Sequence, residues 1–309
     1  MNRTLIVSIF IFFNAVFVFS QQTDSLRIKM LEDKITANLQ FATVNPEKAF
    51  LQTEYLMEQV KREGYKEGEL ILLARQCFYF INKDLKKAIN ANQKLRTKAE
   101  EYGSAYYQAA VHEIFSIIYV RSDLGDKALE ECEAAIKLFD QVNDKSKMQD
   151  VVIHKVNVYT IANEVYTGKK KSKEAVKMLL KANNEIKKLK KSEKKRFILR
   201  ANYTNLAGSY IAFNIDSAEY YVNQSVLLLK NDGKSDIVQF NNNLHLGKIY
   251  KQRKDYVKAI ISYKKAEGQL SYINSTLEST NLIYTDLAEI YKKTDSLEPG
   301  KSLFAKTTI

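Results

Sequence analysis

The sequence has little proline and glycine, the two residues that most often end helices and shape tight turns. Its 309 residues include only 2 Pro and 10 Gly, too few for a sheet protein rich in tight turns. Leu, Ala, Lys, Glu and Gln are abundant instead, and all of them favour helix. Hydrophobic residues make up 45% of the chain, which is enough to build a core. The composition excludes general disorder and predicts an all-α fold.

Reactive sequence motifs are absent as well. No Gly-x-Ser-x-Gly motif, phosphate-binding loop or dinucleotide fingerprint occurs. The 3 histidines, His112, His154 and His245, are scattered, with no pair at metal-ligand spacing. Each is predicted to be a half-exposed helix residue rather than a ligand, although His245 is placed where it could line a groove. The sequence predicts no catalytic residue, no metal site and no cofactor, and therefore a protein that is not an enzyme.

Cysteine is scarce, because only Cys77 and Cys132 occur. In an oxidising compartment the two could form a disulfide. The alternative is two buried small hydrophobic residues on different repeats, since free cysteine is among the most buried residue types. Cys132 falls on an apolar helix face, which favours the second interpretation and leaves the oxidation state open.

Long hydrophobic runs are lacking except at the N-terminus. Arg3 precedes an apolar run over residues 5–19, which is followed by Ser20 and polar residues. This layout predicts a secretory signal peptide over residues 1–20, cleaved after Ser20. A transmembrane anchor is the alternative, but the run is shorter than the roughly 20 residues that span a bilayer. The mature chain is expected to be exported, periplasmic or secreted, with no transmembrane helix and a repeat domain over residues 21–309.

What the sequence does have is a repeated helical pattern, clearest over residues 241–266, NNNLHLGKIYKQRKDYVKAIISYKKA. Two helices joined by a tight polar turn are predicted there. Leu246, Gly247 and Tyr250 lie on the first helix and Ala259 on the second. Small and aromatic residues at these positions are typical of two helices that pack closely against each other.

Fainter copies of this hairpin run along the chain. Seven small residues mark the starts of the second helices: Ala49, Ala88, Ala128, Ala175, Ala218, Ala259 and Gly300. Their spacing of 39 to 47 residues indicates a solenoid with a repeat of about 40. We predict an α–α superhelix, a right-handed solenoid of about seven hairpins. The last hairpin is incomplete; either its tail is partly frayed or the chain is a shortened relative of a longer protein, and the second interpretation is favoured.

Acidic residues are outnumbered by basic ones, 36 against 48, which gives a net charge of +12. The densest basic run lies between Lys187 and Arg196. It is interpreted as a solvated helix end, which the helix dipole favours, in preference to an anion-binding patch. No nucleic-acid partner is predicted for this chain, because Lys outnumbers Arg heavily and an exported protein meets little nucleic acid.

The hairpin at 241–266 resembles the tetratricopeptide repeat, and the resemblance covers about residues 24 to 304. The repeat is longer than the 34 residues of the common form, and no Trp fills the family's large aromatic position. Exported repeats of this kind resemble the sensory regions of bacterial regulators, and the long repeat is similar to that of peptide-sensing tetratricopeptide regulators. The resemblance implies stacked helical hairpins and a partner that is a protein or a peptide.

In such a stack the first helices line a concave groove that binds extended peptides or partner helices. The family pattern places seven polar residues there: Asn157, Thr160, Glu164, Thr204, Asn241, Lys248 and Lys251. Asn205 lies beside this row. Asparagine can both donate to and accept from a peptide backbone, and lysine can pair with a carboxylate. The row is the predicted binding site; the alternative for each residue is a polar side chain that only solvates its helix.

The favoured hypothesis for the function is a non-enzymatic scaffold that presents this groove to a peptide or protein. A second hypothesis is the sensory region of a signal-transduction or transcription regulator that lacks its membrane and output modules. A third is a cell-envelope protein that uses its lysine surplus to hold anionic glycans or lipid. The identity of the ligand and the oligomeric state do not follow from the sequence.

Overall fold

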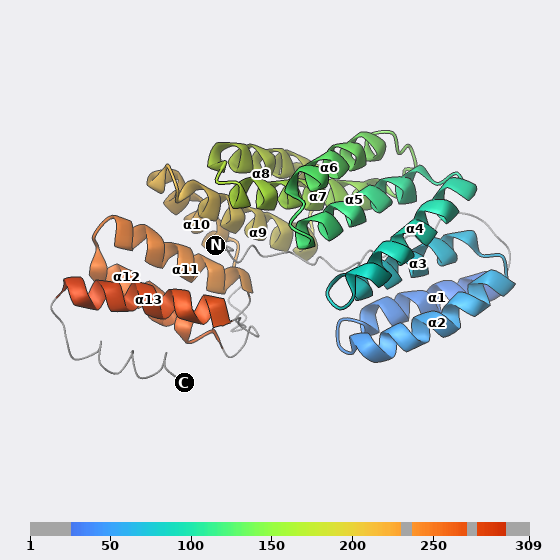
Figure 1. Ribbon diagram of the computed structural model, residues 1–309, viewed down its shortest axis with the longest axis horizontal. Coiled ribbons are helices and arrows are strands. Elements are labelled where there is room, and N and C mark those ends of the chain that lie inside the picture. The colour runs from blue at the N-terminus through green and yellow to red at the C-terminus, as the bar shows by residue number, and fades with distance from the viewer. Residues whose placement is uncertain (1–25, 230–236, 271–276, 295–309) are drawn as a thin grey trace. The chain divides into compact units, whose positions relative to one another are not determined.

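The structure is a computed structural model, and it describes residues 26–229, 237–270 and 277–294. Within these ranges every regular element is a helix, and no strand occurs among them (Figure 1). The all-α prediction is confirmed. The predicted signal peptide over residues 1–20 and the second helix of the seventh hairpin lie outside the described residues.

The chain divides into two compact units, and each is described by itself. The N-terminal unit comprises residues 26–165 and 184–190, and the C-terminal unit comprises residues 166–183 and the described residues from 191 onward. The helices of the N-terminal unit are α1 (Leu26–Phe41), α2 (Pro46–Arg62), α3 (Lys66–Ile81), α4 (Leu85–Glu101), α5 (Ala105–Arg121), α6 (Gly125–Phe139) and α7 (Met148–Gly168) up to residue 165.

The helices of the C-terminal unit continue the same alternation. They are α8 (Ser172–Lys187) up to residue 183, α9 (Glu193–Tyr210), α10 (Ile215–Leu227), α11 (Ile237–Gln252), α12 (Tyr256–Glu267) and α13 (Leu277–Lys293). Within each unit the helices form antiparallel hairpins of the kind that the sequence pattern predicts.

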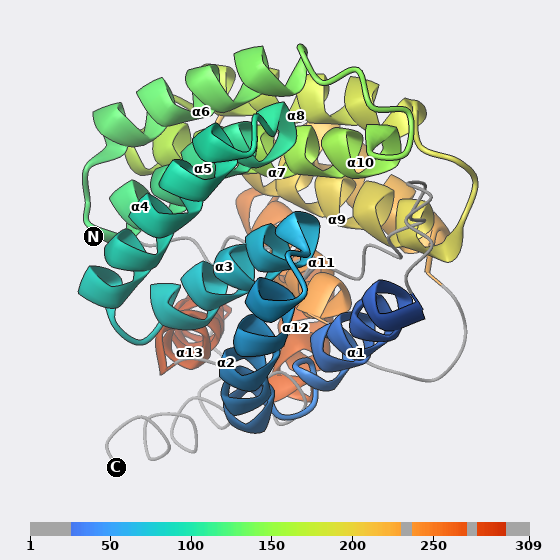
Figure 2. The same ribbon diagram turned by 90° about the vertical axis from the view of Figure 1, so that its right-hand side faces the viewer.

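First helices contact the next first helices in both units. In the N-terminal unit α1 to α6 pack in chain order, and α1 also contacts α3, as α3 contacts α5 (Figure 1, Figure 2). In the C-terminal unit α9 contacts α11 in the same way. The first helices therefore form a layer of their own within each unit, and their polar side chains can meet across neighbouring hairpins.

Six helices begin at a residue whose side chain caps them. Asn45 caps α2 by accepting a hydrogen bond from the backbone N–H of Lys48 at 3.1 Å, and Pro46 fills the first helical position. Five further helices have side-chain caps of the same kind, from Asp84, Ser104, Ser192, Asn214 and Asp255. After α2 and α4 the chain turns at Gly64 and Gly103, each with φ of 65°. Glycine enters this left-handed region without steric strain.

The small residues that mark the repeats lie at the tightest contacts between paired helices. All six that the structure describes are 0% exposed: Ala49, Ala88, Ala128, Ala175, Ala218 and Ala259. A larger side chain there would force the helices apart, because packed interiors have little free volume. The predicted repeat is confirmed for the hairpins α1–α2, α3–α4, α5–α6, α9–α10 and α11–α12, each of which lies within one unit. Gly300 lies outside the described residues.

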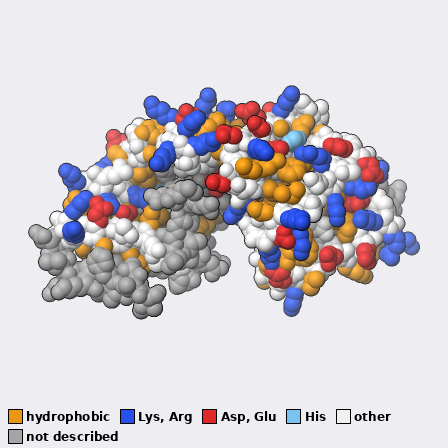
Figure 3. Space-filling view, viewed as in Figure 1, with side chains coloured by type: hydrophobic (Ala, Val, Ile, Leu, Met, Phe, Trp, Pro, Cys, Tyr) orange, Lys and Arg blue, Asp and Glu red, His pale blue; other side chains and the backbone are white. Residues whose placement is uncertain are grey.

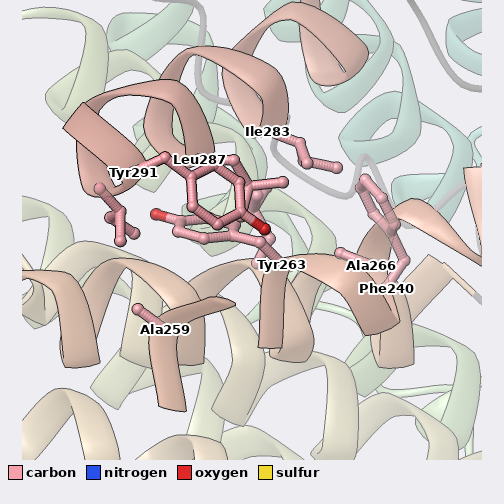
Figure 4. Packing of buried hydrophobic residues seen from close by; sticks show 9 residues of the cluster. Phe240, Ala259, Tyr263, Ala266, Ile283, Leu287 and Tyr291 are labelled. Carbon is pink, nitrogen blue, oxygen red and sulfur yellow. The ribbon is translucent and has the colours of Figure 1, made fainter. Parts of the chain in front are cut away.

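The C-terminal unit has an apolar core shared by α11, α12 and α13. Tyr263 from α12 lies under α13, where Ile283, Leu287 and Tyr291 cover its ring, and Phe240 of α11 borders the same cluster (Figure 4). The Tyr263 hydroxyl donates to Asp286 of α13 at 2.6 Å. This core packs one side of α11 against α12 and α13. The opposite side of α11 is thereby held in a fixed position.

Candidate ligand-binding site

A ring of buried hydrogen bonds fixes α9, α10 and α11 to one another. Asn242 Nδ2 donates to Ser225 Oγ at 2.8 Å, and the Thr204 hydroxyl donates to Asn242 Oδ1 at 2.8 Å. The hydroxyls of Ser225 and Thr204 are 2.9 Å apart, so Ser225 closes the ring by donating to Thr204. Asn242 is only 3% exposed, and the ring pairs both its amide oxygen and its amide nitrogen. The ring therefore sets the register between the two first helices.

Four polar side chains beside this ring form the α9–α11 cluster: Asn205 on α9, and Asn241, His245 and Lys248 on α11. Steps of four and three residues place the last three on one face of α11. Asn241 is 1% exposed, and among the described residues neither its Oδ1 nor its Nδ2 has a hydrogen-bond partner. Buried polar atoms are normally paired, and leaving one unpaired costs about 1–3 kcal/mol. The cluster therefore holds polar groups that the fold does not use.

Two more atoms of the cluster are unpaired in the same way. The Nδ2 of Asn205 and the Nδ1 of His245 are buried, and neither atom has a hydrogen-bond partner in the part of the chain that the structure describes. A Cβ added to Gly208 would lie 2.9 Å from the His245 Nε2, so the absence of a side chain at Gly208 lets this ring lie against α9. Asn205 precedes Gly208 by one helical turn. The unpaired groups of α9 and α11 are therefore neighbours.

Burial controls the charge of the cluster. It lowers the pKa of His245 from 6.5 to about 3, with a smaller contribution from the nearby charge of Lys248. Burial also lowers the pKa of Lys248 below its ordinary value; the charge of Asp286 raises it and that of Lys251 lowers it. At neutral pH His245 is uncharged, so Lys248 is the source of positive charge within the cluster.

Two of the predicted groove residues in this unit belong to contacts within the fold. Thr204 is a member of the buried ring with Ser225 and Asn242. Lys251 donates to Asp286 Oδ1 at 2.6 Å and also pairs with Glu289 of α13. The structure thus brings Asn241 and Lys248 into the cluster and uses Thr204 and Lys251 to hold helices together.

The other three predicted groove residues lie on α7, in the N-terminal unit. Asn157 donates from Nδ2 to Glu113 Oε1 at 3.3 Å. Thr160 is buried, and its hydroxyl donates to the Val156 carbonyl one turn earlier at 2.9 Å. Glu164 is half-buried. Asn157 and Thr160 make their hydrogen bonds within this unit.

His154 joins Asn157 in a buried network with Glu113 and Tyr106 of α5. One ring nitrogen, Nδ1, hydrogen-bonds Glu113 Oε2, and the other, Nε2, lies 2.8 Å from the Tyr106 hydroxyl. His154 is 5% exposed and Glu113 is 2% exposed. The network pairs polar groups from two hairpins and ties α5 to α7.

The expectation that every histidine is half-exposed is wrong for His154 and His245, which are both buried. The physical reason is that first helices contact one another, so polar side chains on their adjoining faces are enclosed by the next hairpin. His112 is partly exposed as expected, and it hydrogen-bonds Glu131 at 2.6 Å.

Sequence reasoning gave Asn205 and His245 only a place beside the predicted row. A signal that the two residues lie next to each other was available, because each precedes the aromatic residue of its helix, Tyr210 or Tyr250, by the same five residues. Equivalent positions on successive first helices lie next to each other in a stack. This register places Asn205 and His245 at matching positions of α9 and α11.

The remaining charged and reactive groups form no second buried site among the described residues. The basic run is partly neutralised by local pairs, Lys188 with Glu185 and Arg196 with Glu193. On the face shown in Figure 3, basic and acidic side chains are interspersed. Within the described ranges no group of His, Cys, Asp and Glu could hold a metal ion. No described helix is long and apolar enough to cross a bilayer.

The two cysteines are buried free thiols, Cys77 on α3 and Cys132 on α6. Burial raises the pKa of the Cys132 thiol to about 12 and raises the pKa of the Cys77 thiol as well. A thiol that stays protonated at neutral pH is a poor nucleophile. Both side chains act in the structure as small hydrophobic residues.

Stacked antiparallel hairpins, small buried residues at the helix contacts and a layer of first helices define the fold as an α–α superhelix of the tetratricopeptide type. No protein-family model matches the sequence, and no curated protein matches it. Solved structures resemble it. One is a signal transduction ATPase with a tetratricopeptide repeat sensor from Pyrococcus horikoshii, at a TM-score of 0.65 and 17% identity over 92% of this chain and 41% of that one. The chain therefore spans less than half the length of that ATPase.

Two further structures are similar over most of both chains. The apo form of RapI matches with a TM-score of 0.57 and 12% identity over 93% of this chain and 87% of that one. NprR in complex with its cognate peptide NprX matches with a TM-score of 0.53 and 15% identity over 92% of this chain and 78% of that one. At such identities the similarity establishes the fold.

Proposed function

We propose that the protein is a non-enzymatic scaffold that binds a peptide at the α9–α11 cluster. The observation that carries this proposal is Asn241, a fully buried amide whose donor and acceptor both lack partners. A peptide backbone offers a carbonyl and an N–H side by side, which are the two groups that an asparagine amide can satisfy together. NprR, solved with its cognate peptide, supports the proposal because its fold is similar.

A selection experiment tests the proposal. The full chain is mixed with a random octapeptide mixture, and the protein is recovered by size-exclusion chromatography. Mass spectrometry then identifies the retained peptides. We expect the full chain to retain a defined subset and the Asn241→Leu variant to retain none of it. Asn223 is an exposed residue of α10, and the matched variant Asn223→Leu should retain the same subset. Equal retention by Asn241→Leu contradicts the proposal.

Export is the second part of the proposal. It rests on the charged start, apolar run and polar end of residues 1–20. The protein recovered from envelope and medium fractions should begin after Ser20, as intact-mass measurement would show. Recovery of the full-length chain from the cytosol alone contradicts export.

A sensory region of a larger regulator is a second candidate function. The observation in its favour is that the Pyrococcus horikoshii ATPase has a tetratricopeptide repeat sensor, and this chain matches only 41% of that protein. Sequencing of the coding region downstream distinguishes the two candidates. A continuing reading frame with a membrane helix and an output module supports the sensor, and a stop codon directly after the chain supports the scaffold.

A further inference from the structure

The outer face of α10, a second helix of the C-terminal unit, exposes large apolar side chains. Tyr220 is 56% exposed and Leu227 is 76% exposed, and their separation of two helical turns places them on one side of the helix. Val226 beside them is 45% exposed. By contrast, α4 of the N-terminal unit has no exposed large apolar residue. Exposed apolar side chains that gather in one place mark a surface that meets a partner.

Tyr220 belongs to a cluster of four rings, the α9–α10 tyrosine cluster, formed by Tyr203 and Tyr210 of α9 and Tyr220 and Tyr221 of α10. The Tyr221 ring lies at its centre, with its centroid 5.5 Å from that of Tyr210, 5.7 Å from that of Tyr203 and 5.1 Å from that of Tyr220. No described residue hydrogen-bonds any of the four hydroxyls, and none of these oxygens is buried. The cluster therefore combines an apolar body with hydroxyl groups that are open to solvent.

The helix α8 borders this cluster and adds positive charge. Its residues Val176 and Leu179 pack against the tyrosines, so that α8, up to residue 183, lies beside α9 and α10 (Figure 1, Figure 2). On the side of α8 turned away from these contacts, Lys173 and Lys177 are exposed and one turn apart. Neither lysine forms an ion pair with a described residue. Like charges at this spacing repel each other in a helix, so the free protein gains nothing from the arrangement.

Lysines on other second helices are paired with acidic residues of the same helix or its cap. Lys98 pairs with Glu101 at 2.7 Å, and Lys258 pairs with Asp255 at 2.8 Å. Before α8, residues 169–171 are three further exposed lysines, and Glu174 is the one acidic residue between 169 and 183. The outer side of α8 is therefore strongly basic beside the exposed apolar face of α10.

This combination of side chains matches the surface of an anionic lipid bilayer. Tyrosine rings are favoured at the level of the lipid headgroups, where the ring meets hydrocarbon and the hydroxyl meets water. Lysines near an anionic bilayer are attracted to it, and their long stems can cover apolar surface while the ammonium stays at the headgroups. Exposed apolar residues such as Leu227 gain free energy when the bilayer removes them from water.

Two other occupants fit less well. Single-stranded nucleic acid binds by stacking its bases on free ring faces, but the Tyr221 ring is enclosed by three neighbouring rings. A second copy of the chain, bound through the same face, would bring Lys173 and Lys177 towards the same lysines of the other copy. A bilayer requires neither free ring faces nor an opposing patch on the protein.

We propose that the outer face of α8 and α10 docks on an anionic lipid bilayer. Lys173 and Lys177 contact the anionic headgroups, and Tyr220 and Leu227 enter the boundary between headgroups and hydrocarbon. This function goes beyond peptide binding and uses second helices, so it leaves the α9–α11 cluster of the first helices free for a ligand.

A fluorophore placed on this face tests the proposal in the full chain. Cys77 and Cys132 are buried, and burial raises the pKa of both thiols, so an environment-sensitive maleimide dye reacts at an introduced exposed cysteine. Asn223→Cys places the dye on the outer face of α10, and Asn90→Cys places it on an exposed position of α4. With phosphatidylcholine vesicles that contain about 30% phosphatidylglycerol, we expect emission to shift to shorter wavelength for Asn223→Cys and to stay unchanged for Asn90→Cys.

Lysine variants of the Asn223→Cys chain tie the shift to α8. Lys173→Gln combined with Lys177→Gln should lower the apparent affinity for these vesicles about thirtyfold, since each lysine near an anionic surface contributes about a fivefold factor. Lys86→Gln combined with Lys94→Gln changes two exposed lysines of α4 and should leave the affinity unchanged. Residues 1–20 are the same in every sample, so differences between the variants do not arise from them.

Two further measurements separate the charged and apolar contributions. Leu227→Ser in the Asn223→Cys chain should lower the affinity about tenfold, because less apolar surface leaves water. Vesicles of phosphatidylcholine alone, or a high salt concentration that screens the lysines, should weaken the shift of Asn223→Cys.

The contradicting results are specific. Equal shifts for Asn223→Cys and Asn90→Cys, or no shift for Asn223→Cys, overturn docking through this face. An affinity that survives Lys173→Gln with Lys177→Gln overturns the role of the lysines. A shift that soluble polyglutamate produces as strongly as the vesicles overturns the bilayer and assigns the face to an acidic polypeptide. Peptide retention at the α9–α11 cluster is measured separately, so the two proposals fail independently.

Discussion

The α5–α7 and α9–α11 helix pairs differ in how their buried polar residues are paired. On α5 and α7 of the N-terminal unit, Glu113 and His154 are buried, and each of the two side chains has hydrogen-bond partners. On α9 and α11 of the C-terminal unit, Asn241 and His245 are equally enclosed, yet they have atoms without partners. The two helix pairs occupy matching positions in their hairpins, so the difference does not come from the fold type.

The difference separates polar groups that hold the protein together from polar groups that stay available. A paired buried network fixes neighbouring hairpins, and its loss leaves uncompensated polar atoms in the core. An unpaired buried group lowers stability in the free protein, and under the proposed function it is retained because a ligand pairs with it. On that proposal the α9–α11 cluster serves binding and the α5–α7 network serves stability, so substitutions should have opposite effects on stability in the two places.

The largest expected effect of a single substitution at neutral pH is in the paired network. The Glu113→Ala variant leaves His154 and Asn157 without their partner, and we expect it to lower the free energy of unfolding by about 3 kcal/mol. Urea denaturation followed by circular dichroism measures the change. A loss below about 0.5 kcal/mol would show that the network does not hold α5 and α7 together, and the contrast between the two units would break down.

Acid should destabilise the C-terminal unit through His245. Its folded pKa of about 3 lies below the unfolded value of 6.5, so between these values the unfolded chain binds a proton that the folded chain does not. The free energy of unfolding therefore falls as the pH falls through this window, by up to about 1.4 kcal/mol per pH unit. Above it His245 has no effect.

The variant His245→Gln isolates this contribution. Its free energy of unfolding, measured in urea at a series of pH values, should fall less steeply with acid than that of the full chain. The variant His112→Gln, at a partly exposed position, serves as the control and should keep the steep dependence. Identical slopes for the full chain and His245→Gln contradict the enclosed, uncharged state of His245.

Two lysines one turn apart on α11 should respond with opposite signs. Lys248→Met removes a largely buried charge that forms no ion pair with any described residue, which should raise the free energy of unfolding by about 1 kcal/mol. Lys251→Met breaks the pairs with Asp286 and Glu289, which should lower it by about 1 kcal/mol. Thermal melts of both variants measure the signs. Destabilisation by Lys248→Met would mean that the fold does use this amine.

The sequence was sufficient for the fold because the repeat depends on local requirements. Ala128 and Ala218 mark a helix contact that admits no larger side chain, and Asn45 with Pro46 marks a helix start by its chemistry. Such signals are present in a few consecutive residues. The hairpins and the spacing between them therefore follow from the sequence, and the structure confirms them in the hairpins that lie within one unit.

The site could be predicted only in part, because pairing joins residues far apart in sequence. His154 hydrogen-bonds Glu113, which lies 41 residues earlier in the sequence. No local sequence feature of either residue indicates this contact. Asn241 and Asn242 are chemically identical and adjacent in sequence, but their side chains point about 100° apart around the helix axis. Asn242 therefore lies in the hydrogen-bonded ring and Asn241 in the α9–α11 cluster. Pattern reasoning selected Asn241 and Lys248 but also Thr204 and Lys251, whose partners lie on other helices.

The smallest expected change in stability belongs to Asn241, and it tests the central claim most directly. Asn241→Leu and Asn242→Leu replace adjacent buried amides with an apolar side chain of similar size. The account predicts that Asn242→Leu, which breaks the ring with Thr204 and Ser225, lowers the free energy of unfolding by about 2 kcal/mol. It predicts that Asn241→Leu leaves that free energy unchanged or raises it slightly while peptide retention is lost. Equal destabilisation by the two substitutions, with peptide retention intact in Asn241→Leu, would contradict it.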